Sequence, residues 1–469
     1  MKWCAEATSL GEALDDQRRD NAVMTPAKRT STHIHAGAPI LQRLPNGVRL
    51  LAIFMPHVQS ASVGVFLQVG SRDETPATNG IGHVLEHMAF KGTTTRSVQA
   101  INLDAERLGA DVNAFTGKDM TGYFMTGLGR HAEPLLRMTA DIVLNSTFPV
   151  SELQRELEVI RQEAIEYEED PQDCSGDLLD RAIWGGHPMG MPVIGTVGNI
   201  EGFTRADLVR HVQSHHVAEK TVVAAVGNFD VEAFLVLGEA LFGAMRGSAG
   251  QATCGSVEPA EYVGQTAARR FTQVSQVFLN VAYPVLPQRR ECLSQQRWRI
   301  AASLAANLFG EGMSSPLVDR VREQLGLAYT AHSTIDGGDV WSNFVVHAVT
   351  TPDKLDALVT AAGGLLRAQA KSIDPVHLER AKNQLTVTRV RASERPYATM
   401  EHAMEELFAS GTVTTTPEAI ALIDSITAEE VRAVFRDMLE RPPALAITGK
   451  GATARRAREL AASLAAAAA

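Results

Sequence analysis

Two stretches of the chain, FTRADLVRHVQSHHVAEKTVVAAVGN at residues 203–228 and ITAEEVRAVFRDMLERPPALAITGK at residues 426–450, follow one pattern. Each opens with capping-box spacing, as in Thr204 with Asp207, and continues with apolar residues at helical intervals. Each then ends in an apolar run typical of a β-strand. A helix followed by a strand therefore recurs near the end of each half of the chain, which predicts an internal duplication.

Earlier segments repeat in the same order. The β-type run ASVGVFLQVGS at 61–71 corresponds to SQVFLNVAYPV at 275–285, and each leads into a helix. The helical segment at 148–164 likewise corresponds to 373–390. We therefore predict two homologous α/β domains (an α/β or α+β class) that arose by duplication, with parallel or mixed sheets both left open.

Composition sets the domain limits that we predict. A Gly-, Ser-, Ala- and Pro-rich segment without apolar periodicity divides the chain nearly in half, as a linker would. The polar start predicts a weakly ordered extension, and the alanine-rich end predicts a fraying helix. The predicted parts are an extension at 1–38, a metal-binding domain at 39–244, a linker at 245–264, a second domain at 265–456 and a tail at 457–469.

The 469 residues carry a net charge of −10 with acidic and basic residues interleaved, which argues against nucleic-acid and anionic-membrane partners. The N-terminal residues are too polar for a signal core, and no run approaches a membrane span. The four cysteines lie far apart without a CxxC pair, which predicts neither a disulfide framework nor a thiolate metal site. A cytoplasmic, reducing location is the expectation.

The segment GHVLEHMAF, residues 82–90, holds the strongest chemical signal. Flanking glycines bound a short helix on which His83 and His87 are one turn apart, the geometry for two imidazole ligands. Glu86 lies between them, so its carboxylate can reach a metal-bound water without binding the metal. The order HxxEH is the inverted form of a zinc-protease motif.

A catalytic zinc also needs a third protein ligand. In the predicted helix 151–171, Glu156 and Glu163 are seven residues apart and share a face, whereas the other glutamates there form an ordinary solvated surface. The histidines His211, His215 and His216 also have helical spacing, but they lack a carboxylate placed like Glu86, which favours structural roles.

Four segments together resemble the pitrilysin-type zinc peptidases, and most of all the processing-peptidase branch with mitochondrial processing peptidase and bacterial single-chain relatives. The segments are GSRDETPATNGIGHVLEHMAFKGT at 70–93, LGADVNAFTGKDMTGYF at 108–124, VIRQEAIEYEEDP at 159–171 and GGHPMGMPVIGT at 185–196. The resemblance implies that His83, His87 and Glu163 bind Zn²⁺. It also implies that Glu86 is the general base and that Glu156 supports a ligand histidine.

The second half has no HxxEH, and the counterpart of Glu163 falls near Thr388. Its segment GEGMSSPLVDRVREQLGLAYTAHS at 310–333 resembles the family's substrate-binding element, which implies that role for Arg322 and Tyr329. In this branch two chains enclose a clam-shell chamber, so the resemblance implies a homodimer with Arg322 and Tyr329 acting in trans. A heterodimer with a related chain is the alternative.

The resemblance further implies that peptide substrates add a strand to an exposed edge at Asn113, Ala114 and Phe115. Pro316 and Met191 stand where relatives often have arginine, so a preference for basic presequences is not expected to carry over. Two functions stay open: a zinc endopeptidase acting on short or unfolded peptides, and a non-catalytic zinc-binding scaffold or partner subunit.

Overall fold

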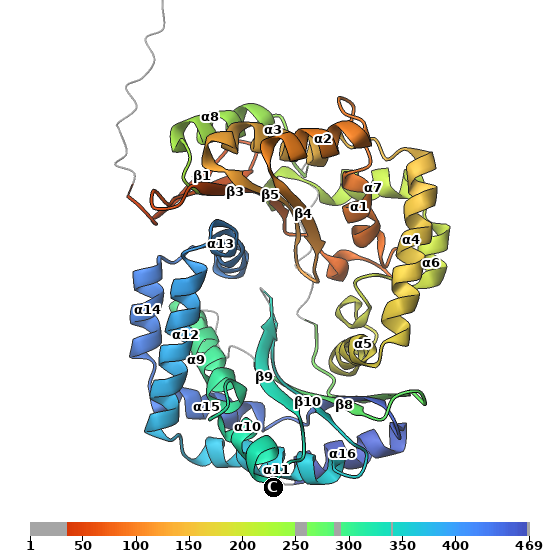
Figure 1. The fold of residues 1–469 in the computed structure, drawn as a ribbon, viewed down its shortest axis with the longest axis vertical. Coiled ribbons are helices and arrows are strands. Elements are labelled where there is room, and N and C mark those ends of the chain that lie inside the picture. The colour runs from red at the N-terminus through yellow and green to blue at the C-terminus, as the bar shows by residue number, and fades with distance from the viewer. Residues whose placement is uncertain (1–34, 249–259, 286–291, 339–340, 467–469) are drawn as a thin grey trace, which may run out of the picture. The chain divides into compact units, whose positions relative to one another are not determined.

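The computed structural model of the protein describes residues 35–248, 260–285, 292–338 and 341–466 (Figure 1). The predicted extension up to residue 34 and most of the predicted linker therefore lie outside the described residues. Two β-sheets with flanking helices make up the described chain (Figure 1).

The first sheet has six strands in the order β1-β2-β6-β3-β5-β4. β2 pairs with β6 in parallel, and the other pairs are antiparallel. The central strands β3 and β6 are buried along almost their whole length, which explains their continuous apolar sequences. The strands are β1 (Pro39–Arg43), β2 (Arg49–Phe54), β3 (Ser60–Leu67), β4 (Asp111–Thr116), β5 (Thr121–Leu128) and β6 (Thr221–Gly227).

The second sheet has the order β7-β11-β8-β10-β9 and repeats the pairing of the first. Its outer pair β7 and β11 is parallel, as β2 and β6 are, and the remaining pairs are antiparallel. Both sheets are therefore mixed, and the predicted pair of related α/β domains is confirmed. The strands are β7 (Thr266–Arg270), β8 (Val277–Pro284), β9 (Thr330–Gly337), β10 (Ser342–Thr350) and β11 (Ala444–Gly449).

The helices follow the same repeat along the chain. In the first half they are α1 (Ile81–Ala89), α2 (Val98–Leu108), α3 (Ala132–Asn145), α4 (Val150–Glu169), α5 (Pro171–Trp184), α6 (Val197–Gly202), α7 (Arg205–His215) and α8 (Val231–Phe242). In the second half they are α9 (Cys292–Gly310), α10 (Pro316–Val318), α11 (Leu355–Lys371), α12 (Pro375–Ala392), α13 (Pro396–Ser410), α14 (Thr416–Ser425), α15 (Ala428–Met438) and α16 (Ala454–Ala466). The capping boxes expected at the starts of α7 and α15 are both formed.

One helix of each half packs on the sheet of the other half. Trp184 of α5 packs with Ala282 of β8 and Ala446 of β11 in one apolar cluster. Conversely, Met404 of α13 packs on the first sheet, in a cluster that includes Phe66 of β3 and several residues of β6. These exchanged contacts cross the domain limits drawn from the sequence, so those limits stay a prediction.

The part of the predicted linker that is described packs against the second half. The Tyr262 hydroxyl donates to the carbonyl of Pro442 and accepts from the amide of Ala444, at 2.9 and 2.6 Å. Within the described ranges, no helix combines the length and the apolar character that a membrane crossing requires. Cys174 is the one cysteine whose side chain is described, and it is a buried free thiol.

Candidate metal centre

Helix α1 is amphipathic, which fixes the direction of its polar side chains. Ile81, Val84, Leu85 and Met88 are buried in one apolar cluster with residues of α4. The helix begins after Gly80, whose φ of +97° lies in the left-handed region, and a Cβ there would lie 2.7 Å from the Cα of Gly195. The polar face that remains carries the three residues of the HxxEH motif.

A buried carboxylate caps the start of α1. Glu74 accepts hydrogen bonds from the amides of Gly80 and Gly82, at 2.8 and 2.9 Å, and from the side chain of Asn79. Burial raises the pKa of Glu74 to about 7, and the three donors oppose that rise by favouring the charged form. Glu74 therefore satisfies backbone donors that the first turn of a helix leaves without partners.

Replacing Glu74 with alanine is expected to lower the free energy of unfolding of the metal-free protein by about 2–3 kcal/mol, because buried donors would lose their acceptor. Urea titration followed by circular dichroism measures the change. The exposed Glu169 at the end of α4 provides the control, since its replacement by alanine should change stability by less than about 0.5 kcal/mol. Equal effects at the two positions would contradict the capping role.

Helix α4 packs against α1 and supplies carboxylates at two positions along its length. Ile160 is fully buried between them, while Glu156 and Glu163 lie one turn or so to either side on the same face. Glu163 meets the start of α1 and Glu156 meets its end, so the two helices run in opposite directions. The shared face predicted from the sequence is present.

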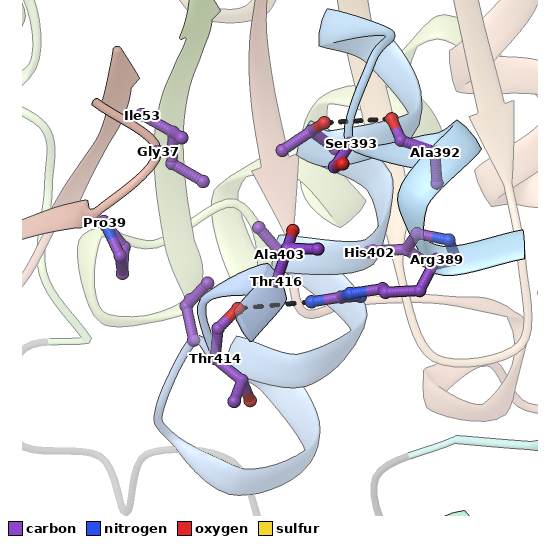
Figure 2. A pocket seen from close by; sticks show the side chains of 12 residues that line it. Gly37, Pro39, Ile53, Arg389, Ala392, Ser393, His402, Ala403, Thr414 and Thr416 are labelled. Carbon is purple, nitrogen blue, oxygen red and sulfur yellow. Dashed lines mark hydrogen bonds between the residues drawn. The ribbon is translucent and has the colours of Figure 1, made fainter. Parts of the chain in front are cut away.

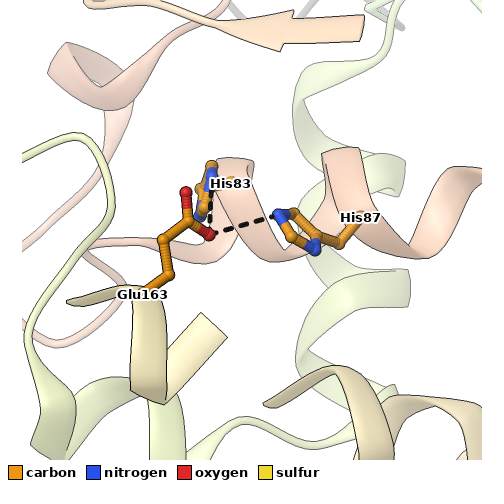
Figure 3. A group of neighbouring side chains, drawn as sticks. All are labelled: His83, His87 and Glu163. Atoms are coloured by element: carbon orange, nitrogen blue, oxygen red, sulfur yellow. Dashed lines mark ion pairs between the residues drawn. The ribbon is translucent and has the colours of Figure 1, made fainter. Parts of the chain in front are cut away.

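The side chains of His83, His87 and Glu163 converge (Figure 3). Glu163 Oε2 lies 4.0 Å from His83 Nε2 and 3.6 Å from His87 Nε2. Tetrahedral zinc, with bonds of about 2.0–2.1 Å, holds its ligand atoms about 3.3 Å apart. Both Glu163 distances are longer than that, and the candidate ligand atoms of all three side chains lie within 4.8 Å of one another, so side-chain rotations would bring them to zinc-binding distance.

The electrostatic state of His83 also fits a metal ligand. Burial, followed by the neighbouring His87, lowers the pKa of His83 to about 4, so its imidazole is neutral near pH 7. Neutral imidazole is the form that binds zinc. Within the described ranges, no other group of three or more His, Cys, Asp or Glu side chains comes as close together.

The second nitrogen of His87 is held from the opposite side. Its Nδ1 lies 3.2 Å from Glu156 Oε2, and the other oxygen of Glu156 lies 2.6 Å from Lys91 Nζ. An imidazole that donates from Nδ1 presents a lone pair at Nε2. The contact therefore turns the free electron pair of His87 toward Glu163.

Glu86 projects from α1 close to the triad without being part of it. Burial raises the pKa of its carboxyl group, and hydrogen bonds from Thr116 oppose this rise. The charge of His87 also lowers the pKa, whereas the charge of Glu163 raises it. Burial raises the pKa of Tyr123 too, and the Glu86 charge adds to that effect. The carboxylate thus lies between the metal triad and the end of β4.

Strand β4, which contains Asn113, Ala114 and Phe115, is the outer strand of the first sheet. One of its outward donors is covered, because the Ala114 amide donates to the Oδ1 atom of Asn113 at 2.9 Å. A side chain that covers an edge donor can be displaced by a peptide carbonyl. β4 therefore offers a strand edge next to the triad.

Arg322 and Tyr329 lie together in the second half. The guanidinium of Arg322 stands over the Tyr329 ring at 5.0 Å from its centroid, and Tyr329 is 78% exposed. This exposure leaves the Tyr329 ring accessible to another molecule. In the described parts of the chain, neither side chain forms a hydrogen bond or ion pair with the residues of the triad.

Four other histidines of the first half, His187, His211, His215 and His216, take structural positions. His187 caps a short 3₁₀ turn by accepting the Met189 amide at 3.1 Å. The rings of His211 and His215 stack with centroids 4.2 Å apart, and the half-buried His216 packs edge-on against His211. None of the four belongs to the convergent triad, which for His211, His215 and His216 agrees with the structural roles favoured by the sequence.

A separate pocket lies between the β1–β2 region and helices α12 to α14 (Figure 2). Its cation, Arg389, donates to the Thr414 carbonyl at 3.2 Å and pairs with Glu406 at 2.9 Å. That charge is therefore used within the fold, and the pocket shares no residue with the triad.

Three residues around the triad were not identified from the sequence: Glu74, Lys91 and Thr116. All three stand within segments that carry the family resemblance, at 70–93 and 108–124. Their contacts depend on how α1 meets neighbouring elements, which no spacing rule in a single sequence describes.

Models of two families match the chain. The model described as insulinase, peptidase family M16, matches residues 50–197, and the model described as peptidase M16 inactive domain matches residues 202–385. The first match contains the whole triad. The second contains Arg322 and Tyr329.

Curated relatives of similar length are uncharacterized zinc proteases of bacteria. The chain is 32% identical to one from Streptomyces coelicolor over 418 residues, 87% of this chain and 88% of the relative. It is 30% identical to one from Bacillus subtilis over 403 residues, 86% of this chain and 96% of the relative.

Solved structures share the fold. A protease from Helicobacter pylori superposes with a TM-score of 0.80 at 19% identity, covering 88% of this chain and 99% of that one. A chain of complex III2 from Candida albicans gives 0.77 at 19% identity, covering 90% and 99%. Because relatives at 30% identity and above match along most of their length, and both halves match family models, this chain belongs to the M16 family of zinc proteases.

Proposed function

We propose that this zinc protease is a cytoplasmic endopeptidase that hydrolyses short or unfolded peptides, with Glu86 as its general base. One observation carries the proposal: two imidazoles and a carboxylate from separate helices converge, and a further carboxylate stands beside them on α1. A scaffold needs no proton acceptor next to a metal site. The same residue types in this order are what hydrolysis requires.

In this proposal, His83, His87 and Glu163 hold the zinc ion. A zinc ion held by these three side chains would act as a Lewis acid: it would lower the pKa of a bound water to about 7 and would polarise the substrate carbonyl. Glu163 contributes a negative charge to the cage, and its partly exposed position leaves one side open to substrate.

Glu86 moves the proton. A carboxylate whose pKa is raised by burial accepts a proton from water more readily and can return it to the departing amine. Hydrogen bonds from Thr116 keep the carboxylate oriented between the triad and β4. Glu156 in turn fixes His87 with Nε2 directed at the metal, through the contact at Nδ1.

The substrate binds as an added strand along β4. Its carbonyl displaces the Asn113 side chain from the Ala114 amide, and main-chain pairing of this kind accepts many sequences. Extended, unfolded peptides are therefore the expected substrates, and folded proteins are not.

Replacing Ala114 with proline is expected to raise the KM for peptide substrates about tenfold, because it removes one outward donor worth roughly 1–1.5 kcal/mol. Proline is tolerated in edge strands where the missing amide faced away from the sheet. Steady-state kinetics measures KM, and zinc content should be unchanged. An unaltered KM in a folded variant would contradict binding along β4.

The proposed assembly is a homodimer enclosing a chamber, in which Arg322 and Tyr329 of one protomer act at the zinc of its partner; a heterodimer remains the alternative. The high exposure of Tyr329 supports a contact beyond its own domain. The buried free thiol of Cys174 suits a reducing cytoplasm, which cell fractionation would test.

Zinc analysis combined with cleavage of a quenched-peptide library tests the function. We expect one zinc per chain and cleavage within peptides, with positions mapped by mass spectrometry. Stoichiometric zinc without turnover on any peptide would instead identify a scaffold or partner subunit. Absence of zinc under all conditions would overturn both functions.

A further inference from the structure

A lysine completes a line of contacts that runs through the metal centre. Lys91 follows α1 by two residues, and its Nζ lies 2.6 Å from Glu156 Oε1. The second oxygen of the same carboxylate lies 3.2 Å from His87 Nδ1. Glu156 is therefore shared between one cation and one imidazole, with a different oxygen facing each.

The spacing along α1 makes this possible. His83 and His87 are one turn apart on α1, and Lys91 lies just beyond its end, where its contact with Glu156 shows that it too faces α4. Glu163 contacts the first two and Glu156 contacts the last two. His87 is thus the residue held by both carboxylates.

We infer that Lys91 is a positioning residue for the metal centre, a role that rests on the proposed zinc site. It holds Glu156 in the orientation that lets Oε2 accept the proton of His87 Nδ1, and so keeps Nε2 available to the metal. Without the ammonium group, the carboxylate can rotate away or swing to solvent. His87 would then lose its fixed tautomer and ring orientation.

The environment distinguishes this pair from an ordinary surface salt bridge. Only 12% of the Glu156 side chain and 25% of the Lys91 side chain are exposed, so solvent screens the pair weakly. Ion pairs between fully exposed side chains contribute little by comparison. Lys91 also stands beyond the carboxyl end of α1, where a cation is favoured by the helix dipole.

The test measures zinc affinity of the full-length, metal-free chain by competition with a chromophoric chelator. Lys91→Met is expected to raise the zinc dissociation constant about tenfold, while Lys91→Arg keeps it within about threefold. Circular dichroism of both metal-free variants verifies folding. Lys450→Met, which removes an exposed lysine of the second half, is the matched control and should leave zinc affinity unchanged.

A double-mutant cycle tells positioning through Glu156 from a general effect of charge. If Lys91 acts through that carboxylate, Lys91→Met adds no further loss in a Glu156→Gln background. An equal loss in both backgrounds, or a folded Lys91→Met variant that binds zinc like the wild type, overturns the inference. A wild-type chain that binds no zinc would instead overturn the proposed function, so the two failures are distinguishable.

Discussion

Glu86→Gln is expected to lower kcat for peptide cleavage by about 10²–10⁴-fold, the usual contribution of a general base, while the bound zinc remains. Glutamine has nearly the same shape as glutamate but cannot accept the proton of water. Because Glu86 lies outside the convergent triad, zinc content should stay at one ion per chain. Cleavage of a quenched peptide and metal analysis of the same sample measure both quantities.

Two further variants serve as controls for Glu86→Gln. His87→Ala removes a proposed ligand, so it should lose zinc and activity together. Glu166→Gln changes an exposed carboxylate on α4 and should lose neither. If Glu86→Gln kept wild-type turnover, or lost its zinc, the assignment of Glu86 as a base that does not bind the metal would be wrong.

The sequence could predict the parts of this site that depend on local spacing. Helix α1 exists because apolar residues recur at helical intervals between flanking glycines, and this periodicity places His83 and His87 one turn apart. The seven-residue interval from Glu156 to Glu163 likewise placed both on one face of α4. That Glu163 rather than Glu156 is the predicted metal ligand came from the family resemblance, since spacing alone put both on the same face.

The exchange of α5 and α13 between the sheets could not be predicted. Both helices have an apolar face, and an apolar face packs equally well on either sheet, because hydrophobic burial has no direction. The sheet on which each helix packs is decided by the chain connections. Nothing in the residue types of Trp184 or Met404 indicates which sheet that is. The same holds for Lys91 and Glu74, whose partners lie on other elements.

A mixture of Glu86→Gln chains with Arg322→Ala chains is expected to recover about a quarter of wild-type activity if the site is shared between protomers. Free exchange makes half of the dimers mixed, and each mixed dimer has one site with both residues intact. Alone, Arg322→Ala should lower kcat/KM about 10–100-fold, because a charged hydrogen-bond donor to the substrate is lost. Alone, Glu86→Gln should be nearly inactive.

If Arg322 instead acted within its own chain, every site in the mixture would carry one of the two defects. Activity could then not exceed half of that of Arg322→Ala alone, several times below the quarter expected for shared sites. Differently tagged chains, co-purified after mixing, establish that exchange took place, and a Tyr329→Ala chain in place of Arg322→Ala repeats the experiment. Because Tyr329 and Arg322 contact each other, both variants should complement Glu86→Gln to the same extent.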